Sequence, residues 1–202
     1  MANLKGKEKG TTHTTQPIPW NAAMTLLDVM KDKKKEANTR LMFACGFYTA
    51  FRIGDILTLT WGDLWGDTFR RFEQKTGKGR KISVNPDLKR IALETYNLMP
   101  KKPLDDELIF IVQKNVRDKK AISVTAANKR VAKHFEKYGI TAANPSSHTL
   151  RKTFARRVYD NNGQTDAALH ILSEILNHAD IKTTRKYIGL TDELIKDIYL
   201  NL

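Results

Sequence analysis

The sequence predicts a mainly α-helical domain that carries one small antiparallel β-sheet, an α+β fold. Two observations lead to this prediction: apolar residues recur at helical spacing over most of the chain, and a hairpin-like pattern replaces them only between Asp67 and Val84. The chain has 202 residues, of which 41% are hydrophobic, and it contains no internal repeat. This size and composition fit one domain with an ordinary core, with or without a tail.

The first sixteen residues differ in composition from the rest. Residues 1–16 contain Gly, Thr and Lys with almost no large apolar side chain, so we expect a flexible basic arm or linker there. Proline and frequent large apolar residues begin with the segment Pro17-Ile18-Pro19-Trp20. We therefore expect the folded domain to cover 17–202.

Helices are expected where apolar residues repeat every three to four positions. In chain order they cover about 21–31, 36–49, a short piece that begins at 53, 86–100, 124–138, 148–160, 165–177 and 191–200. Asn21 and Thr191 are the expected N-caps of the first and the last of these helices. The helix at 36–49 is apolar nearly all round in its second half, which predicts a central position in the core.

The expected sheet is a β-hairpin. Phe69 and Phe72 precede the turn residues Lys75-Thr76-Gly77-Lys78-Gly79, and Ile82 and Val84 follow them. Apolar residues on both sides of a Gly-containing turn are typical of two antiparallel strands. The hairpin would therefore present a lysine-rich tip.

The charge balance points to a polyanionic partner. Lys and Arg number 35 against 22 Asp and Glu, which gives a net charge of +13 and a pI near 9.8. Such a charge favours DNA or RNA, and the alternative is a charged surface that only keeps the protein soluble. No apolar run approaches the roughly 18 residues that span a bilayer, and the N-terminus has no secretory pattern. Together with the single Cys45, which cannot form an internal disulfide, this predicts a cytoplasmic protein without membrane contact.

Five residues suit chemistry on a phosphodiester. His148 and Arg151 form a His-x-x-Arg pair, His178 and Tyr187 follow it nine residues apart, and Arg52 ends a long apolar run far upstream. Two guanidiniums can bracket the oxygens of a phosphate through paired N–H donors. A tyrosine with a pKa near 10 needs help to become a nucleophile, and histidines can supply it.

These motifs resemble the catalytic domain of the tyrosine recombinase (phage integrase) family over roughly 17–202. The segment from Phe47 to Leu57 looks like the family's first conserved box, with Asp55 as its supporting acidic member. The family's set of Arg, Lys, His, Arg, His and Tyr matches, in that order, Arg52, Lys75, His148, Arg151, His178 and Tyr187. Lys78 is the alternative to Lys75. Where the family usually has Gly before the second histidine, this chain has Asn177, which tolerates the left-handed conformation second best after Gly.

Each residue has a plainer interpretation when taken alone. Arg52 could be a helix cap or an ion pair with Asp55, His148 and Arg151 a solvated pair, His178 a helix-end residue, and Tyr187 part of the packing. The joint occurrence in the family's order argues against all of these at once.

The resemblance implies a site-specific DNA recombinase, encoded by a bacterium, phage or mobile element, that acts at the nucleoid. Tyr187 would form a 3′-phosphotyrosyl intermediate, while Arg52, Arg151 and His178 hold the phosphate. Neither ATP nor a cofactor is implied, and the sequence has no clustered Cys and His or paired acidic residues suited to a metal. The alternatives are relaxation of DNA by a type IB topoisomerase and a catalytically silent DNA-binding module.

The resemblance also bears on assembly. Family members carry an N-terminal core-binding domain that residues 1–16 are too short to form, so the chain is either part of a longer recombinase or a minimal enzyme. The expected state is a monomer in isolation and a homotetramer on two paired sites of double-stranded DNA. Leu194, Ile195 and Ile198 form an apolar stripe on the last helix, which could dock on a neighbouring protomer. Without DNA, we expect that stripe to pack on the chain's own core.

Overall fold

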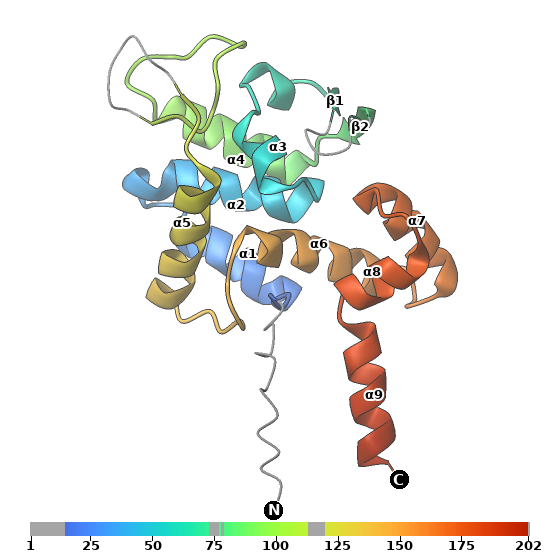
Figure 1. Cartoon of the computed structure of the whole chain (residues 1–202). Helices are drawn as coiled ribbons and strands as arrows, with labels where there is room; N and C mark the ends of the chain where they lie inside the picture. Colours follow the sequence, from blue (N-terminus) through green and yellow to red (C-terminus); the bar gives the residue numbers. More distant parts are fainter. Residues whose placement is uncertain (1–14, 73–76, 78, 113–119, 202) are drawn as a thin grey trace, which may run out of the picture.

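Helix α2 (Ala37–Thr49) lies at the centre of the domain, surrounded by other helices (Figure 1). The computed structural model describes residues 15–72, 77, 79–112 and 120–201. Within that part, α2 packs against α1 (Trp20–Val29), α4 (Pro86–Asn97) and α6 (Ser147–Asn161). Eleven of its thirteen residues are buried, which confirms the predicted central position.

The remaining elements complete a mainly helical fold with one hairpin. They are η1 (Lys34–Glu36), α3 (Ile53–Leu57), η2 (Gly62–Leu64), β1 (Thr68–Phe72), β2 (Gly79–Ser83), α5 (Val124–Lys137), α7 (Asp166–Leu176), α8 (Ile181–Tyr187) and α9 (Leu190–Leu200). Strands β1 and β2 pair antiparallel, from Thr68 opposite Ser83 to Phe72 opposite Gly79. The predicted fold class is therefore confirmed.

Two apolar clusters hold the helices together. The larger one surrounds α2 and includes the fully buried rings of Phe43, Phe47 and Phe110. Cys45 lies in it, and burial raises the pKa of its thiol well above the usual value. A smaller cluster joins the second half of α6 to α7 and α8 through Leu172, Leu176, Ile188 and three further residues. This smaller cluster supports the candidate site.

Several helix boundaries differ from those expected. Helix α1 begins at Trp20, and its N-cap residue is Pro19. Asn21 therefore lies inside the helix and is not its cap, although its side chain accepts a hydrogen bond from the N–H of Ala22. The last helix begins at Leu190 after Gly189, whose φ is 83°, so Thr191 is not the N-cap either. In both places the backbone conformation before the expected cap had already started the helix.

Helix α8 was not expected at all. Its seven residues start after Asp180, whose carboxylate accepts a hydrogen bond of 2.6 Å from the N–H of Thr183. Thr183 and Thr184 are β-branched and favour a helix only weakly, so the segment has no strong helical pattern of its own. The Asp180 cap and the packing of Thr184, which is fully buried, override that weak preference.

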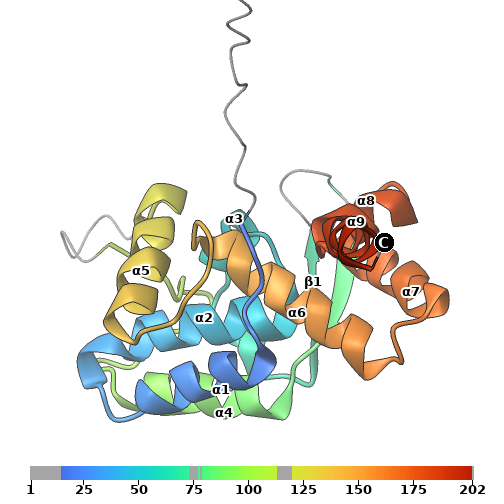
Figure 2. The same ribbon diagram turned by 90° about the horizontal axis from the view of Figure 1, so that it is seen from below.

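Helix α9 extends away from the body of the domain (Figures 1 and 2). The element it packs against is α8, its neighbour in the chain. The side chains of Ile195 and Ile198 are 49% and 53% exposed, and the side chain of Leu194 lies outside the described residues. The expectation that the stripe packs on the chain's own core is therefore wrong for Ile195 and Ile198.

The predicted N-terminal arm falls mostly outside the described residues. Its last two residues are described: Thr15 donates a hydrogen bond to the carbonyl of Asn144, and the N–H of Gln16 donates to that of Ala143. Among the residues that the structure describes, no helix has the length and apolar character needed to cross a membrane.

Candidate active site

Arg151 is the most deeply anchored of the predicted site residues. It lies one turn into α6, whose start is fixed by a capping box between Ser146 and Thr149. Its side chain is only 2% exposed. One guanidinium nitrogen, Nη1, donates to the carbonyl of Ala50, and Nη2 donates to that of Leu176 at 2.6 Å. Arg151 is therefore a buried junction between helices, which excludes the solvated pair with His148.

The two carbonyls that bind Arg151 lie at helix C-termini. Ala50 ends α2 with φ at 56°, and Asn177 ends α7, directly after Leu176, with φ at 53° and ψ at 47°. Both residues have a left-handed backbone conformation, as residues at many helix C-termini do. The carbonyl groups at a helix C-terminus carry partial negative charge, which attracts a cation. The left-handed geometry expected at Asn177 is confirmed. Two helix ends thus hold one guanidinium in place.

Arg52 and Asp55 lie at the start of α3. Arg52 is the N-cap residue, with an extended backbone, and its carbonyl accepts hydrogen bonds of 3.0 Å from the N–H groups of Asp55 and Ile56. The Arg52 side chain is half-buried, and Asp55 is 4% exposed. Because Arg52 follows Ala50 by two residues, the chain brings it close to the carbonyl that anchors Arg151.

His178 precedes α8 and Tyr187 is its last residue, and the two side chains are in contact. Nδ1 of His178 is 3.0 Å from the hydroxyl oxygen of Thr184, which orients the imidazole ring. The ring centroids of His178 and Tyr187 are 5.1 Å apart at 76°, an edge-to-face contact. His178 therefore meets the tyrosine through the ring and not through the hydroxyl group.

Tyr187 has a buried hydroxyl group. The phenol oxygen has no well-aligned hydrogen bond within the described part of the chain, and the guanidinium of Arg151 is its nearest candidate donor there. Burial raises the pKa of Tyr187 above its usual value of 10.0, and the positive charges of Arg151 and Arg52 offset part of that rise. The two arginines thus lie close enough to favour the phenolate form of this side chain.

Four of the six predicted residues come together: Arg52, Arg151, His178 and Tyr187. His148 is exposed at the start of α6, one turn before Arg151. Lys75 and Lys78 lie outside the described residues, between the ends of β1 and β2.

Sequence reasoning missed Lys152, which follows Arg151 on α6. Its Nζ atom lies 5.1 Å from the centre of the Tyr187 ring, and the side chain is buried. No motif singled it out, because a lysine in a basic helix ordinarily faces water. Only the tertiary structure, which places Tyr187 of α8 beside α6, reveals the contact.

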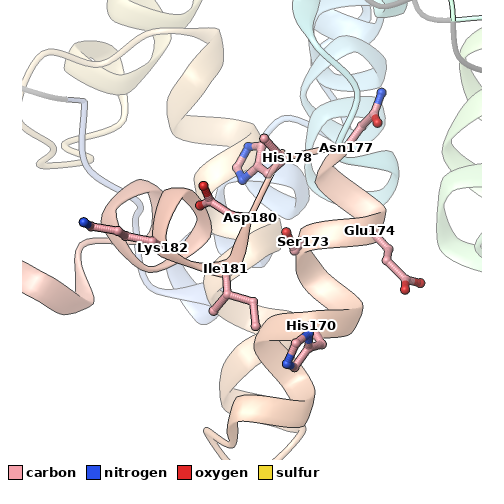
Figure 3. A pocket seen from close by; sticks show the side chains of 9 residues that line it. His170, Ser173, Glu174, Asn177, His178, Asp180, Ile181 and Lys182 are labelled. Atoms are coloured by element: carbon pink, nitrogen blue, oxygen red, sulfur yellow. The ribbon is translucent and has the colours of Figure 1, made fainter.

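A cavity of about 750 Å³ opens beside this site, at the turn between α7 and α8. Figure 3 shows its lining, with His170 and Glu174 from α7, Lys182 from α8 and His178 from the turn between them. His178 can therefore be reached from solvent on one side while it contacts Tyr187 on the other. Among the described residues, no group of three or more His, Cys, Asp or Glu side chains could share a metal ion.

The chain is similar in sequence to known recombinases. The model of the phage integrase family matches residues 18–193. The probable integrase/recombinase YoeC of Bacillus subtilis (strain 168) is 31% identical over 190 residues, which cover 93% of this chain and 96% of that protein. Tyrosine recombinase XerD of Oceanobacillus iheyensis is 28% identical over 184 residues, 86% of this chain and 57% of that protein. The chain thus spans nearly all of YoeC but about half of the XerC and XerD relatives.

Solved structures share the fold. The crystal structure of XerA recombinase matches with a TM-score of 0.68 and 20% identity, over 98% of this chain and 67% of that one. XerH bound to palindromic difH substrate, in a post-cleavage complex, matches with a TM-score of 0.65 and 21% identity, over 88% and 50%. Because the family model covers most of the chain and the fold agrees, this protein belongs to the phage integrase family of tyrosine recombinases and contains its catalytic domain.

Proposed function

We propose that this protein is a site-specific DNA recombinase that cleaves and rejoins DNA through a 3′-phosphotyrosyl intermediate at Tyr187. One observation carries the proposal: the Tyr187 hydroxyl is buried, which raises its pKa, and the positive charges of Arg151 and Arg52 offset part of that rise. A tyrosine that served packing alone would not need two guanidiniums close enough to lower its pKa. The same two cations are suited to the phosphate that the oxygen would attack.

The proposed reaction conserves bond energy. The oxygen of Tyr187 attacks the phosphorus, and the bond from phosphorus to the 5′-oxygen breaks. The family resemblance assigns the proton of Tyr187 to His148, which lies exposed one turn before Arg151 on α6. Lys75, or alternatively Lys78, protonates that leaving oxygen. A 5′-hydroxyl from the partner duplex then attacks the phosphotyrosine and releases Tyr187, so neither ATP nor a metal ion is required.

Phosphate binding falls to Arg52, Arg151 and His178. Negative charge grows on the non-bridging oxygens during attack, and fixed donors stabilise it without reorganisation. Arg151 is held by two helix-end carbonyls, and the His178 ring is oriented by Thr184, so both groups are preorganised. The carboxylate of Asp55 supports this region from α3.

The decisive experiment tests for the covalent adduct. Nicked duplexes that tile the DNA flanking the gene serve as suicide substrates, and the adduct is detected by its slower migration on a denaturing gel. Wild-type protein should form it, and Tyr187→Phe should bind the same DNA without forming it. An adduct with the Phe variant would show that another residue is the nucleophile. Relaxation of a one-site plasmid without exchange between two sites would favour the topoisomerase reading instead.

Assembly is the second part of the proposal. We infer that 17–202 acts as the catalytic domain, that 1–16 is a basic linker, and that the protein works in the cytoplasm as a monomer that tetramerises on paired sites. The half-exposed Ile195 and Ile198 on the projecting helix α9 support docking onto a second copy of this chain. Deleting 191–202 should weaken the pairing of two DNA sites more than the binding of one. If the shortened chain paired sites normally, α9 would have no role in assembly.

A further inference from the structure

Lys152 occupies an unusual position for a lysine. It follows Arg151 on α6, and it is only 9% exposed. Lysine is almost never buried unless its ammonium group finds a compensating interaction. Here the ring of Tyr187 supplies one, since Nζ of Lys152 lies 5.1 Å from the ring centre.

The contacts of Tyr187 are made mainly by its ring. The edge-to-face contact with His178 and the contact with Lys152 hold the ring, while the hydroxyl oxygen has no well-aligned hydrogen bond within the described residues. The direction in which the oxygen points therefore depends on what fixes the ring. Within the described part of the chain, Lys152 is the cation that lies over that ring.

We propose that Lys152 is a positioning residue for Tyr187: its ammonium group holds the phenol ring against His178, and its positive charge stabilises the phenolate that forms as the hydroxyl proton leaves. This inference rests on the proposed role of Tyr187 as nucleophile. It adds a group that acts through the tyrosine and does not itself contact DNA.

Lys152 is one of several positively charged or titratable side chains near Tyr187, and its position differs from that of the others. Arg151 and Lys152 face it from α6, Arg52 from the start of α3, and His178 from the turn before α8. The arginines are also the proposed phosphate ligands, and a bound phosphate partly neutralises them. Lys152 lies over the ring face, so its charge remains available to the phenolate when DNA is bound.

The test compares three variants of the full chain and keeps a fourth in reserve. Lys152→Met removes the charge and keeps an unbranched side chain of similar length. Lys152→Arg keeps the charge, and an arginine can still lie over the ring. Lys186→Met is the matched control, because Lys186 is an exposed lysine next to Tyr187 on α8. Lys152→Gln is a second neutral variant in case Lys152→Met does not fold.

The first measurement needs no DNA. Protein labelled with ¹³C at the tyrosine Cζ position is titrated with base, and the Tyr187 resonance is identified by its absence in Tyr187→Phe. Lys152→Met should raise the pKa of Tyr187 above that of the wild type. Lys152→Arg should titrate close to the wild type, and Lys186→Met should shift the titration less than Lys152→Met does.

The second measurement is the single-turnover rate of adduct formation at saturating DNA, as a function of pH. Lys152→Met should slow it by about 10- to 30-fold, with its alkaline rise moved to higher pH, while DNA affinity changes no more than in Lys186→Met. Equal titrations and rates for Lys152→Met and Lys186→Met would overturn the inference. If the wild type forms no adduct but Lys152→Met still shifts the Tyr187 titration, the proposed function fails and the contact between the two side chains stands.

Discussion

At Gly46, helices α2 and α6 approach so closely that there is no room for a side chain. A Cβ atom at this residue would lie 2.6 Å from Cβ of Leu150 and 2.9 Å from its Cδ1. Ordinary contacts between such atoms begin at 3.4 Å. Because the Cβ of Leu150 is fixed to the backbone of α6, rotation of the leucine side chain cannot relieve the clash. We predict that Gly46→Ala forces the two helices apart.

Two effects of opposite sign decide the size of the change. Alanine is the better helix former by about 1 kcal/mol, which favours the variant. Overpacking a core costs about 1–3 kcal/mol, and the upper end applies because the helices must separate by roughly 0.8 Å. We expect a net loss of about 1–2 kcal/mol in the free energy of unfolding and a Tm lower by roughly 2–8 °C. The shift would also move Arg151, and a misplacement near 1 Å can slow cleavage by about 100-fold.

The assay is urea and thermal unfolding followed by circular dichroism, together with the adduct rate. Ala132→Gly on the exposed face of α5 measures the helix-propensity effect in this protein. The double variant Gly46→Ala, Leu150→Ala should not recover stability, since the contact between the two Cβ atoms remains. A Gly46→Ala protein as stable as the wild type, or more stable, would refute the close-packing argument.

Three further predictions concern the site. Arg151→Lys should lower stability by about 1–3 kcal/mol and abolish adduct formation, because one ammonium cannot bind the carbonyls of both Ala50 and Leu176; thermal unfolding and the adduct assay measure this. Asn177→Ala should cost about 1 kcal/mol through its left-handed backbone, while Asn177→Gly should match the wild type in urea midpoint. Burial raises the folded-state pKa of Tyr187 above its unfolded value near 10, so this group's contribution to stability is present below pH 10 and is lost as pH rises further. Tyr187→Phe should therefore lose less stability than the wild type above pH 10, measured by urea unfolding at stepped pH.

The sequence predicts this fold well where a helix has its own apolar pattern. The central helix, the hairpin and the left-handed end at Asn177 all follow from local spacing and residue type. The sequence fails at α8, where β-branched threonines favour a helix only weakly and tertiary packing decides. It also misplaces Ile195 and Ile198, because an apolar stripe shows that a helix seeks a partner and not which surface it finds.

The site shows the same division. The types and order of Arg52, Arg151, His178 and Tyr187 indicate the chemistry, because each has a property that phosphoryl transfer needs. The groups that hold these side chains cannot be identified from the sequence, because every residue has a backbone carbonyl. Arg151 is fixed by the carbonyls at two helix ends and not by an acidic residue of a motif. Lys152 does not stand out in the sequence for a related reason, since its role depends on the fold bringing the Tyr187 ring beside α6.

The position of Tyr187 links the chemistry to assembly. Tyr187 is the last residue of α8, and the next residue, Ile188, is buried in the cluster formed by α6, α7 and α8. Gly189 then turns the chain with φ at 83° and starts the projecting α9. If α9 docks on a second copy, as proposed, its displacement can reach the tyrosine through Gly189, through the anchored Ile188 and through the packing of α9 against α8. Buried Ile188 keeps the nucleophile in place when α9 is free, so docking controls cleavage to the extent that it moves Ile188 or α8 against the cluster.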